Sequence, residues 1–316
     1  MCDGSSPANP NARSQAVASA SDSGPRPGVV KSPSLVLITA CPDTTGVVAA
    51  VASFLAGNNC LITEAQHYDD LISDTSFMRT VFHDNGHGAP SLRELDALFS
   101  NSVAQRFGMR WKFHEAQRKC RTVLAVSKHG HCLNSMLHRW STGTLPIEVV
   151  AVVSNHQEMR SLSEWHGVPY HYLPVIDGRK AEQEERIIEL FEKVDGELLV
   201  LARYMQILSP RACEYFAGRA INIHHSFLPG FKGAKAYHQA HARGVKLIGA
   251  TAHYVTTDLD EGPIIEQETA RVDHTMAPEE LVSIGSELES VVLNRAVKWH
   301  AERRVFTNGS KTVVLR

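Results

Sequence analysis

Three polar side chains between residues 220 and 263 have the types and spacing that acyl chemistry requires. Asn222 and His224 are two residues apart in a short apolar run that reads as a strand, so both side chains face the same way. An amide and an imidazolium side by side are a pair of donors for the oxyanion of a tetrahedral intermediate. Asp260 comes from a later element, before a Gly-Pro turn. Its carboxylate would favour the charged imidazole and could orient or deprotonate a water.

These residue types alone leave other interpretations open. An Asn-x-His pair on a strand is usually packing or turn chemistry, and an Asp before Gly-Pro is usually part of a simple turn. A metal site is a second alternative, because histidines are frequent in this stretch: His224, His225, His238, His241 and His253. Neighbouring side chains of a strand diverge, and the sequence has no HExxH motif or cysteine cluster, so we expect no metal.

The elements that must position these residues form an α/β pattern over 121–316. Nearly all-apolar strands alternate with amphipathic helices, which predicts a Rossmann-like, doubly wound and mostly parallel sheet. Ligands of such folds bind at the carboxyl ends of the strands, where Asn222 and His224 would lie. We predict strands at 123–127, 147–154, 168–173, 198–202, 247–255 and 264–272, helices at 131–140, 181–194, around 237–240 and at 278–301, a helix capped by Ser209, and a terminal strand pair around the turn Asn308-Gly309.

A smaller unit precedes this domain, over 34–114. Its strands at 35–40, 60–68, 76–83 and 109–113, with helices from Val47 and over 91–105, give a βαββαβ, ferredoxin-like order. We expect Asp43 or Thr44 to cap the first helix, which carries Val47, Val48, Val51, Phe54 and Leu55 on one face, and the turn Asp69-Asp70 to join the second and third strands. Residues 115–120 read as a linker and residues 1–33 as a disordered tail.

Bulk properties exclude several classes of protein. With 32 basic and 34 acidic residues among 316, the chain has no basic excess that would suggest a nucleic-acid partner. We find no apolar run of bilayer length and no apolar signal-peptide core. The tail has few basic residues, so a transit peptide is the less favoured interpretation of residues 1–33. Six scattered cysteines predict reduced thiols in a cytoplasmic protein.

The motifs around the three polar residues resemble those of enzymes that use 10-formyltetrahydrofolate. Asn222-Ile-His224-His-Ser-Phe-Leu-Pro229 is similar to their Asn-x-His-x-Ser-x-Leu-Pro motif, and His253-Tyr-Val-Thr-Thr-Asp-Leu-Asp260-Glu-Gly-Pro matches their second motif. The resemblance implies that Asn222, His224 and Asp260 are catalytic. It also implies that the folate lies along the following residues: Met205, Gln206, Ile207, Leu208, His253 and Val255.

The amino-terminal unit resembles an ACT domain. Its turn Cys41-Pro-Asp43-Thr44-Thr45-Gly46 and the strand from Asp74 to Thr80 carry the likeness. ACT domains bind amino acids near this turn and commonly pair. The resemblance therefore implies an amino-acid effector, glycine or methionine, at Asp43, Thr44, Thr45 and Gly46, and a homo-oligomer.

Within the enzymes that use this folate, the chain is most similar to the formyltetrahydrofolate deformylases. Glycinamide ribonucleotide formyltransferases carry a Gly-Asn-Gly-Ser-Asn phosphate loop, whereas this chain has Ser127-Lys-His129-Gly-His131-Cys132 at that place. Methionyl-tRNA formyltransferases add a carboxyl-terminal domain that helps to bind tRNA, and we expect no such domain here. Deformylases join an ACT domain to the catalytic domain and match Val126-Ser-Lys-His-Gly-His131-Cys-Leu133.

This likeness implies hydrolysis of 10-formyltetrahydrofolate to tetrahydrofolate and formate without a cofactor. The formate would supply purine biosynthesis, and the reaction would balance one-carbon pools. A formyltransferase acting on a small amine and a non-catalytic binding protein are the alternatives.

Overall fold

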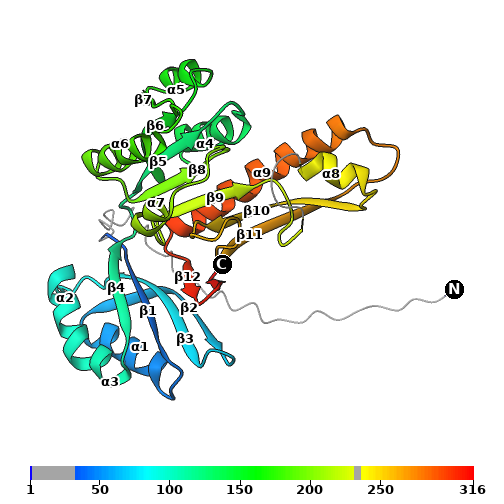
Figure 1. The fold of residues 1–316 in the computed structure, drawn as a ribbon. Helices are drawn as coiled ribbons and strands as arrows, with labels where there is room; N and C mark the ends of the chain where they lie inside the picture. Colours follow the sequence, from blue (N-terminus) through cyan, green and yellow to red (C-terminus); the bar gives the residue numbers. More distant parts are fainter. Residues whose placement is uncertain (2–32, 231–235) are drawn as a thin grey trace. The chain divides into compact units, whose positions relative to one another are not determined.

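The computed structural model describes Met1, residues 33–230 and residues 236–316 (Figure 1). The tail predicted over 1–33 therefore lies almost entirely outside the described residues. Residues 33–316 form one compact unit, which contains a four-stranded sheet, a seven-stranded sheet and a two-stranded hairpin. Among the described residues, none of the helices combines the length and apolar character that crossing a bilayer needs.

The first sheet confirms the predicted βαββαβ order. Its strands lie in the order β2-β3-β1-β4, with all three pairings antiparallel. Interlocked aromatic rings form its core, with Phe99 in edge contact with Phe54 and Phe113. The elements are β1 (Leu35–Pro42), α1 (Val47–Gly57), β2 (Cys60–Asp70), β3 (Thr75–Asp84), α2 (Leu92–Phe99), the π-helical turn η1 (Ser100–Ala104), α3 (Gln105–Phe107) and β4 (Arg110–Glu115).

Two local predictions in this unit are wrong. Helix α1 begins after Gly46, whose φ of 95° brings the chain into the helix with no side-chain cap, so neither Asp43 nor Thr44 caps it. The turn between β2 and β3 is not Asp69-Asp70, because both aspartates continue the ladder opposite β3. The chain reverses after them, where Asp70 accepts hydrogen bonds from the Ile72 amide (3.1 Å) and the Ser73 hydroxyl (3.0 Å).

Smaller differences concern exposure and strand length. Val48 is 42% exposed, so it does not share the buried face of α1. Strand β4 continues to Glu115 and β5 begins at Cys120, so the connection between the two sheets is shorter than the predicted linker.

The second sheet is mostly parallel, as predicted. Its strand order is β11-β10-β9-β8-β5-β6-β7. The five strands β9, β8, β5, β6 and β7 run parallel, while β10 pairs antiparallel with both β9 and β11. The Ser209 cap with Pro210 in the first turn of α7 is confirmed. The elements are β5 (Cys120–Val126), α4 (His131–Ser141), β6 (Ile147–Ser154), α5 (Arg160–Trp165), β7 (Tyr170–Tyr172), α6 (Lys180–Lys193), β8 (Leu198–Leu201), α7 (Pro210–Tyr215), β9 (Ala220–His224), α8 (Ala236–Ala242), β10 (Leu247–Tyr254), β11 (Ile264–Arg271) and α9 (Pro278–Ala301).

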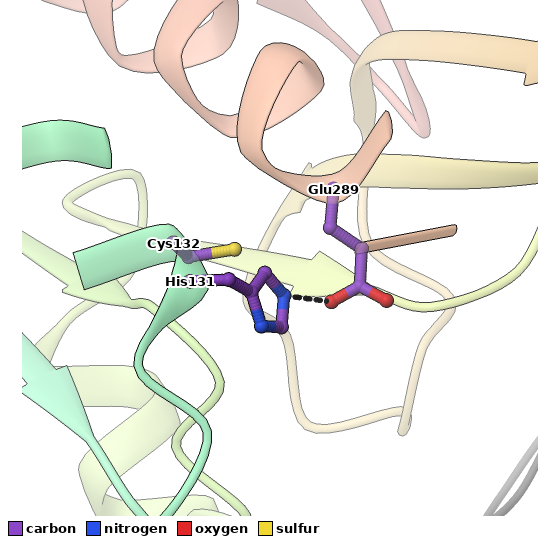
Figure 2. Close-up of side chains that lie close together, drawn as sticks. All are labelled: His131, Cys132 and Glu289. Carbon is purple, nitrogen blue, oxygen red and sulfur yellow. Dashed lines mark hydrogen bonds and ion pairs between the residues drawn. The ribbon is translucent and has the colours of Figure 1, made fainter. Parts of the chain in front are cut away.

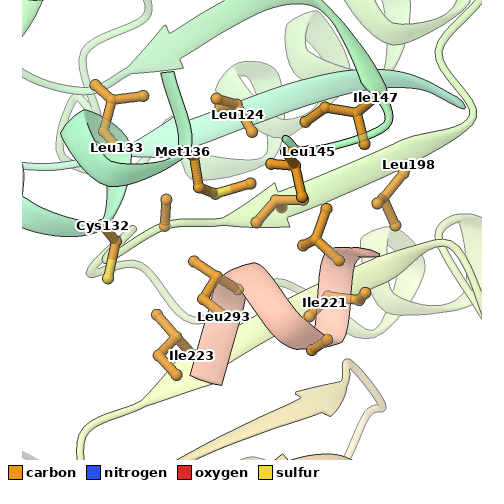
Figure 3. Packing of buried hydrophobic residues seen from close by; sticks show 14 of the residues in the cluster. Leu124, Cys132, Leu133, Met136, Leu145, Ile147, Leu198, Ile221, Ile223 and Leu293 are labelled. Atoms are coloured by element: carbon orange, nitrogen blue, oxygen red, sulfur yellow. The ribbon is translucent and has the colours of Figure 1, made fainter. Parts of the chain in front are cut away.

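Helices cover both faces of this sheet, which is why its strands are almost wholly apolar. On one face, α4 and α9 pack Met136 and Leu293 against Leu124 and Ile221 of the strands (Figure 3). On the other face, α6 contributes Ile187 and Phe191. The carboxyl ends of β5, β8 and β9 are thereby held at one edge, above a close-packed core.

The terminal hairpin joins β12 (Val305–Asn308) to β13 (Lys311–Val314). Asn308 pairs with Lys311, so the two-residue turn is Gly309-Ser310, one residue later than predicted, with Gly309 at a φ of 60°. Phe306 and Leu315 pack against Phe77 of the first sheet. The chain end therefore belongs to the core of its amino-terminal unit.

Candidate active site

Strands β9 and β10 position the predicted catalytic side chains. Asn222 and His224 lie at the carboxyl end of β9, and His253 of the antiparallel strand β10 lies directly opposite Asn222. Asp260 follows in a tight loop and has a φ of 58°, a left-handed conformation. A Cβ atom at Gly262 would overlap the Tyr254 carbonyl oxygen, so this loop can close against β10 only with glycine there.

His224 and Asp260 form a buried pair. His224 Nδ1 is 3.3 Å from Asp260 Oδ2, and the two side chains are only 4% and 8% exposed. Burial by itself would raise the pKa of Asp260, but the hydrogen bond and charge of His224, with the nearby imidazoles, outweigh it and lower that pKa. Asp260 is therefore a carboxylate at neutral pH and fixes the orientation of the His224 ring.

A second histidine orients the Asn222 amide. His253 Nδ1 is 2.9 Å from the Tyr254 carbonyl oxygen, which can only accept, so Nδ1 carries the proton. Burial lowers the pKa of His253, so its ring is neutral and Nε2 accepts from Asn222 Nδ2 at 3.2 Å. One N–H of the amide is thus held in place, and its orientation fixes the direction of the other.

A cavity of about 260 Å³ opens beside these groups. All nine residues predicted to be catalytic or to contact the folate line it, because β8 and β9 end side by side and deliver their loops to the same place. Its walls are mainly apolar, which suits the flat ring of a pterin. The lining residues from the prediction are Met205, Gln206, Ile207, Leu208, Asn222, His224, His253, Val255 and Asp260.

Arg203 and His225 also line the cavity, although neither is among the predicted site residues. Arg203 has a φ of 66° directly after β8, and His225 follows the last residue of β9. Alternation of strand residues predicted that His225 would point elsewhere, but the strand ends at His224 and the rule no longer applies. Burial, Arg203 and His224 lower the pKa of His225 to about 4, so it is neutral.

Behind this wall lies a group of side chains that we call the Glu289 cluster: His131, Arg203, Tyr237 and Glu289. Glu289 of α9 is 1% exposed and accepts hydrogen bonds from His131 Nε2 (2.8 Å, Figure 2) and the Tyr237 hydroxyl (3.0 Å). Arg203 Nε is 3.3 Å from the same carboxylate. Burial tends to raise the pKa of Glu289, but His131 and Arg203 outweigh this and lower it, so Glu289 is ionised.

The metal alternative finds little support in the part of the chain that the structure describes. His238 and His241 are exposed on α8 and do not line the cavity. Ligand-type side chains gather instead at His131, Cys132 and Glu289. There His131 and Arg203 already contact the carboxylate, and burial strongly raises the pKa of the Cys132 thiol, which disfavours the thiolate a metal needs.

The predicted effector residues lie in the first unit, away from these groups. Asp43, Thr44, Thr45 and Gly46 form an exposed turn between β1 and α1. The Asp43 amide donates to the Asp74 carbonyl oxygen at 3.0 Å, which ties this turn to the start of β3.

Comparisons with known proteins show the family to which the chain belongs. The model of the formyl transferase family matches residues 120–297. A formyltetrahydrofolate deformylase of Corynebacterium sp. is 49% identical, over 89% of this chain and 98% of its own length. The crystal structure of a formyltetrahydrofolate deformylase from Burkholderia mallei is 48% identical, covers 90% of this chain and all of its own, and superposes with a TM-score of 0.85.

The likeness to transferases is narrower. A glycinamide ribonucleotide transformylase from Symbiobacterium toebii is 28% identical and superposes with a TM-score of 0.60, over 63% of this chain and 95% of its own. The deformylases match both sheets, whereas this transferase matches a smaller share. The chain therefore belongs to the formyltetrahydrofolate deformylase family.

Proposed function

We propose that this protein hydrolyses 10-formyltetrahydrofolate to tetrahydrofolate and formate. The observation that carries the proposal is the buried His224–Asp260 pair beside the oriented Asn222 amide, all lining one apolar cavity. Membership of the deformylase family supplies the substrate. The formyl carbon would lie next to the three polar groups, with the pterin along residues 205–208.

Water is the nucleophile in this mechanism. Asp260 orients it and accepts its proton, directly or through His224, as the water oxygen bonds to the formyl carbon. The Asn222 amide and the His224 imidazolium stabilise the resulting oxyanion. The bond from the formyl carbon to N10 then breaks, N10 takes a proton, and formate leaves.

The reaction needs no cofactor under this proposal, because a carboxylate, an imidazole and an amide supply all the proton transfers and charge stabilisation. We also propose a cytosolic location. The five cysteines of the described residues are buried free thiols, as expected for a reducing compartment.

Formate release from purified protein and 10-formyltetrahydrofolate tests the function directly. We expect equal amounts of formate and tetrahydrofolate, with or without an added amine such as glycinamide. Tetrahydrofolate formed only when an amine is present, together with the formylated amine, would instead make the protein a transferase.

We further propose that an amino acid, glycine or methionine, binds the turn of Asp43, Thr44, Thr45 and Gly46 and changes the rate, and that the protein is a homo-oligomer. The support is the ferredoxin-like order of the first sheet and the backbone contact that ties this turn to β3. Rate and melting temperature measured across the twenty amino acids test the effector, and light scattering tests the oligomer. No response to any amino acid would remove the first idea, and a monomeric mass the second.

A further inference from the structure

The strand order defines a second place where a ligand of this fold would bind. From β5 the chain goes to β6 on one side and later returns to β8 on the other side, so the loops after β5 and β8 diverge from a switch point. In open parallel sheets the crevice at such a point is the usual ligand site. Here it lies directly beside the cavity that we propose binds the folate, which is built on the ends of β8 and β9 and is called the folate cavity below.

Hydrogen bonds tie the two loops together across this crevice. Ser127, the residue after β5, donates its amide to the Arg203 carbonyl oxygen at 3.1 Å. Its hydroxyl accepts from the Met205 amide at 2.9 Å and donates to Asn155 Oδ1 at 2.7 Å, so the loop after β6 joins in. Three loops that could part around a ligand are therefore fixed to one buried side chain.

Arg203 connects these loops to the Glu289 cluster, because its carbonyl oxygen accepts from the Ser127 amide and its side chain lies 3.3 Å from Glu289. The Glu289 carboxylate lies next to the first turn of α4, 2.8 Å from His131 Nε2, with Cys132 packed beside it (Figure 2). A helix N-terminus favours a negative charge, and in many nucleotide-binding folds it holds a phosphate. In this chain an internal carboxylate lies against side chains of that first turn, and Arg203 balances its charge at 3.3 Å.

The cluster is linked to the predicted catalytic groups through His225. The His225 ring centroid is 5.1 Å from that of His224 and 6.1 Å from that of Tyr237, whose hydroxyl binds Glu289. Arg203 and His225 line the folate cavity as well. Arg203 and His225 thus join the wall of the cavity to the Glu289 cluster.

We propose that the Glu289 cluster occupies the acceptor side of the site and so makes water the acceptor in place of an amine. An amine would have to bring its substituents through this crevice to reach the formyl carbon, whereas water needs no such room. In such a transfer the amine nitrogen bonds to the formyl carbon, the bond to N10 breaks, and the amine proton passes to N10. This inference rests on the proposed hydrolysis.

The test is a change of product caused by opening the crevice. His131→Ala removes the imidazole but leaves the Arg203–Glu289 ion pair, and His138→Ala, an exposed position on the same helix, is the matched control. Each protein receives 10-formyltetrahydrofolate with saturating glycinamide. Formate and N-formylglycinamide are quantified by mass spectrometry, and folding is checked by thermal melting.

We expect His131→Ala to form N-formylglycinamide at least about tenfold faster than the wild type, the usual effect of a changed pocket wall on acceptor choice. The control should match the wild type. If His131→Ala does not fold, His131→Ser replaces it. If the folded variant releases formate at the wild-type rate and forms no N-formylglycinamide, the inference is overturned but the proposed function stands. If the wild-type protein itself releases no formate, both the proposed function and the inference are removed.

Discussion

Replacing Asn222 by alanine measures the oxyanion stabilisation that we propose for its amide. The amide nitrogen is held at 3.2 Å from His253 Nε2, so its second N–H has a fixed direction and costs no reorganisation in the transition state. Loss of one such donor raises the barrier by roughly 3 kcal/mol, which is about 150-fold in kcat. KM should change little, because the amide adds almost no apolar area to the folate cavity.

His253→Ala separates orientation from stabilisation. That change keeps the Asn222 donor but removes the acceptor that orients it, so we expect a loss of about tenfold, the size of one ordinary hydrogen bond. His241→Ala, at an exposed histidine outside the cavity, serves as the control. Steady-state formate release gives kcat and KM for each variant. If Asn222→Ala keeps more than about a third of the wild-type kcat, or alters KM alone, the amide is not an oxyanion donor and the reasoning fails.

Three further predictions concern the carboxylates and the loop that holds one of them. Asp260→Asn should lower kcat at least about 100-fold, and full activity in the variant would contradict the assignment. Since the pKa of Asp260 lies below its ordinary value of 3.8, the wild type should keep this carboxylate's contribution to kcat down to about pH 4. Glu289→Ala should lower the free energy of unfolding, measured in urea, by about 3–5 kcal/mol, because it leaves Arg203 buried without its partner. That difference should be complete above Glu289's ordinary pKa of 4.5 and vanish as pH falls through its lowered pKa, so a constant difference down to pH 2 would refute the assignment. Gly262→Ala should reduce kcat even at temperatures where melting curves show the variant to be folded, because the new Cβ displaces the loop of Asp260 from the Tyr254 carbonyl. Unchanged kinetics would show that the loop can shift freely.

Sequence patterns predicted the central residues because their proximity is local. Asn222 and His224 are neighbours on one face of a strand, whereas residues 205–208 were implied by the family resemblance and are found to line the same cavity. Helix α9 was also predicted at its observed ends, since Pro278 and a long apolar stripe mark it.

The Glu289 cluster was not predicted, because its contacts join residues 52 to 158 positions apart in the sequence. One signal was available. Glu289 lies three and four residues before Val292 and Leu293, on the buried stripe of α9, and a charged residue on such a stripe must have a partner. The capping error in the first unit has a local cause. Asp43 and Thr44 are ordinary capping residues, but Gly46 in a left-handed conformation precedes helix α1, and no side chain caps the helix.

The terminal hairpin has a consequence for biosynthesis. Phe77, Ala40, Phe306 and Leu315 make one small core, so residues near both ends of the described chain complete it together. Arg304 adds a contact of 3.0 Å to Glu64 of β2. During translation the first sheet leaves the ribosome with this face bare, and its partner strand β12 begins 190 residues after the end of β4 (from Glu115 to Val305). The amino-terminal unit therefore reaches its final packing only after the catalytic domain has been synthesised.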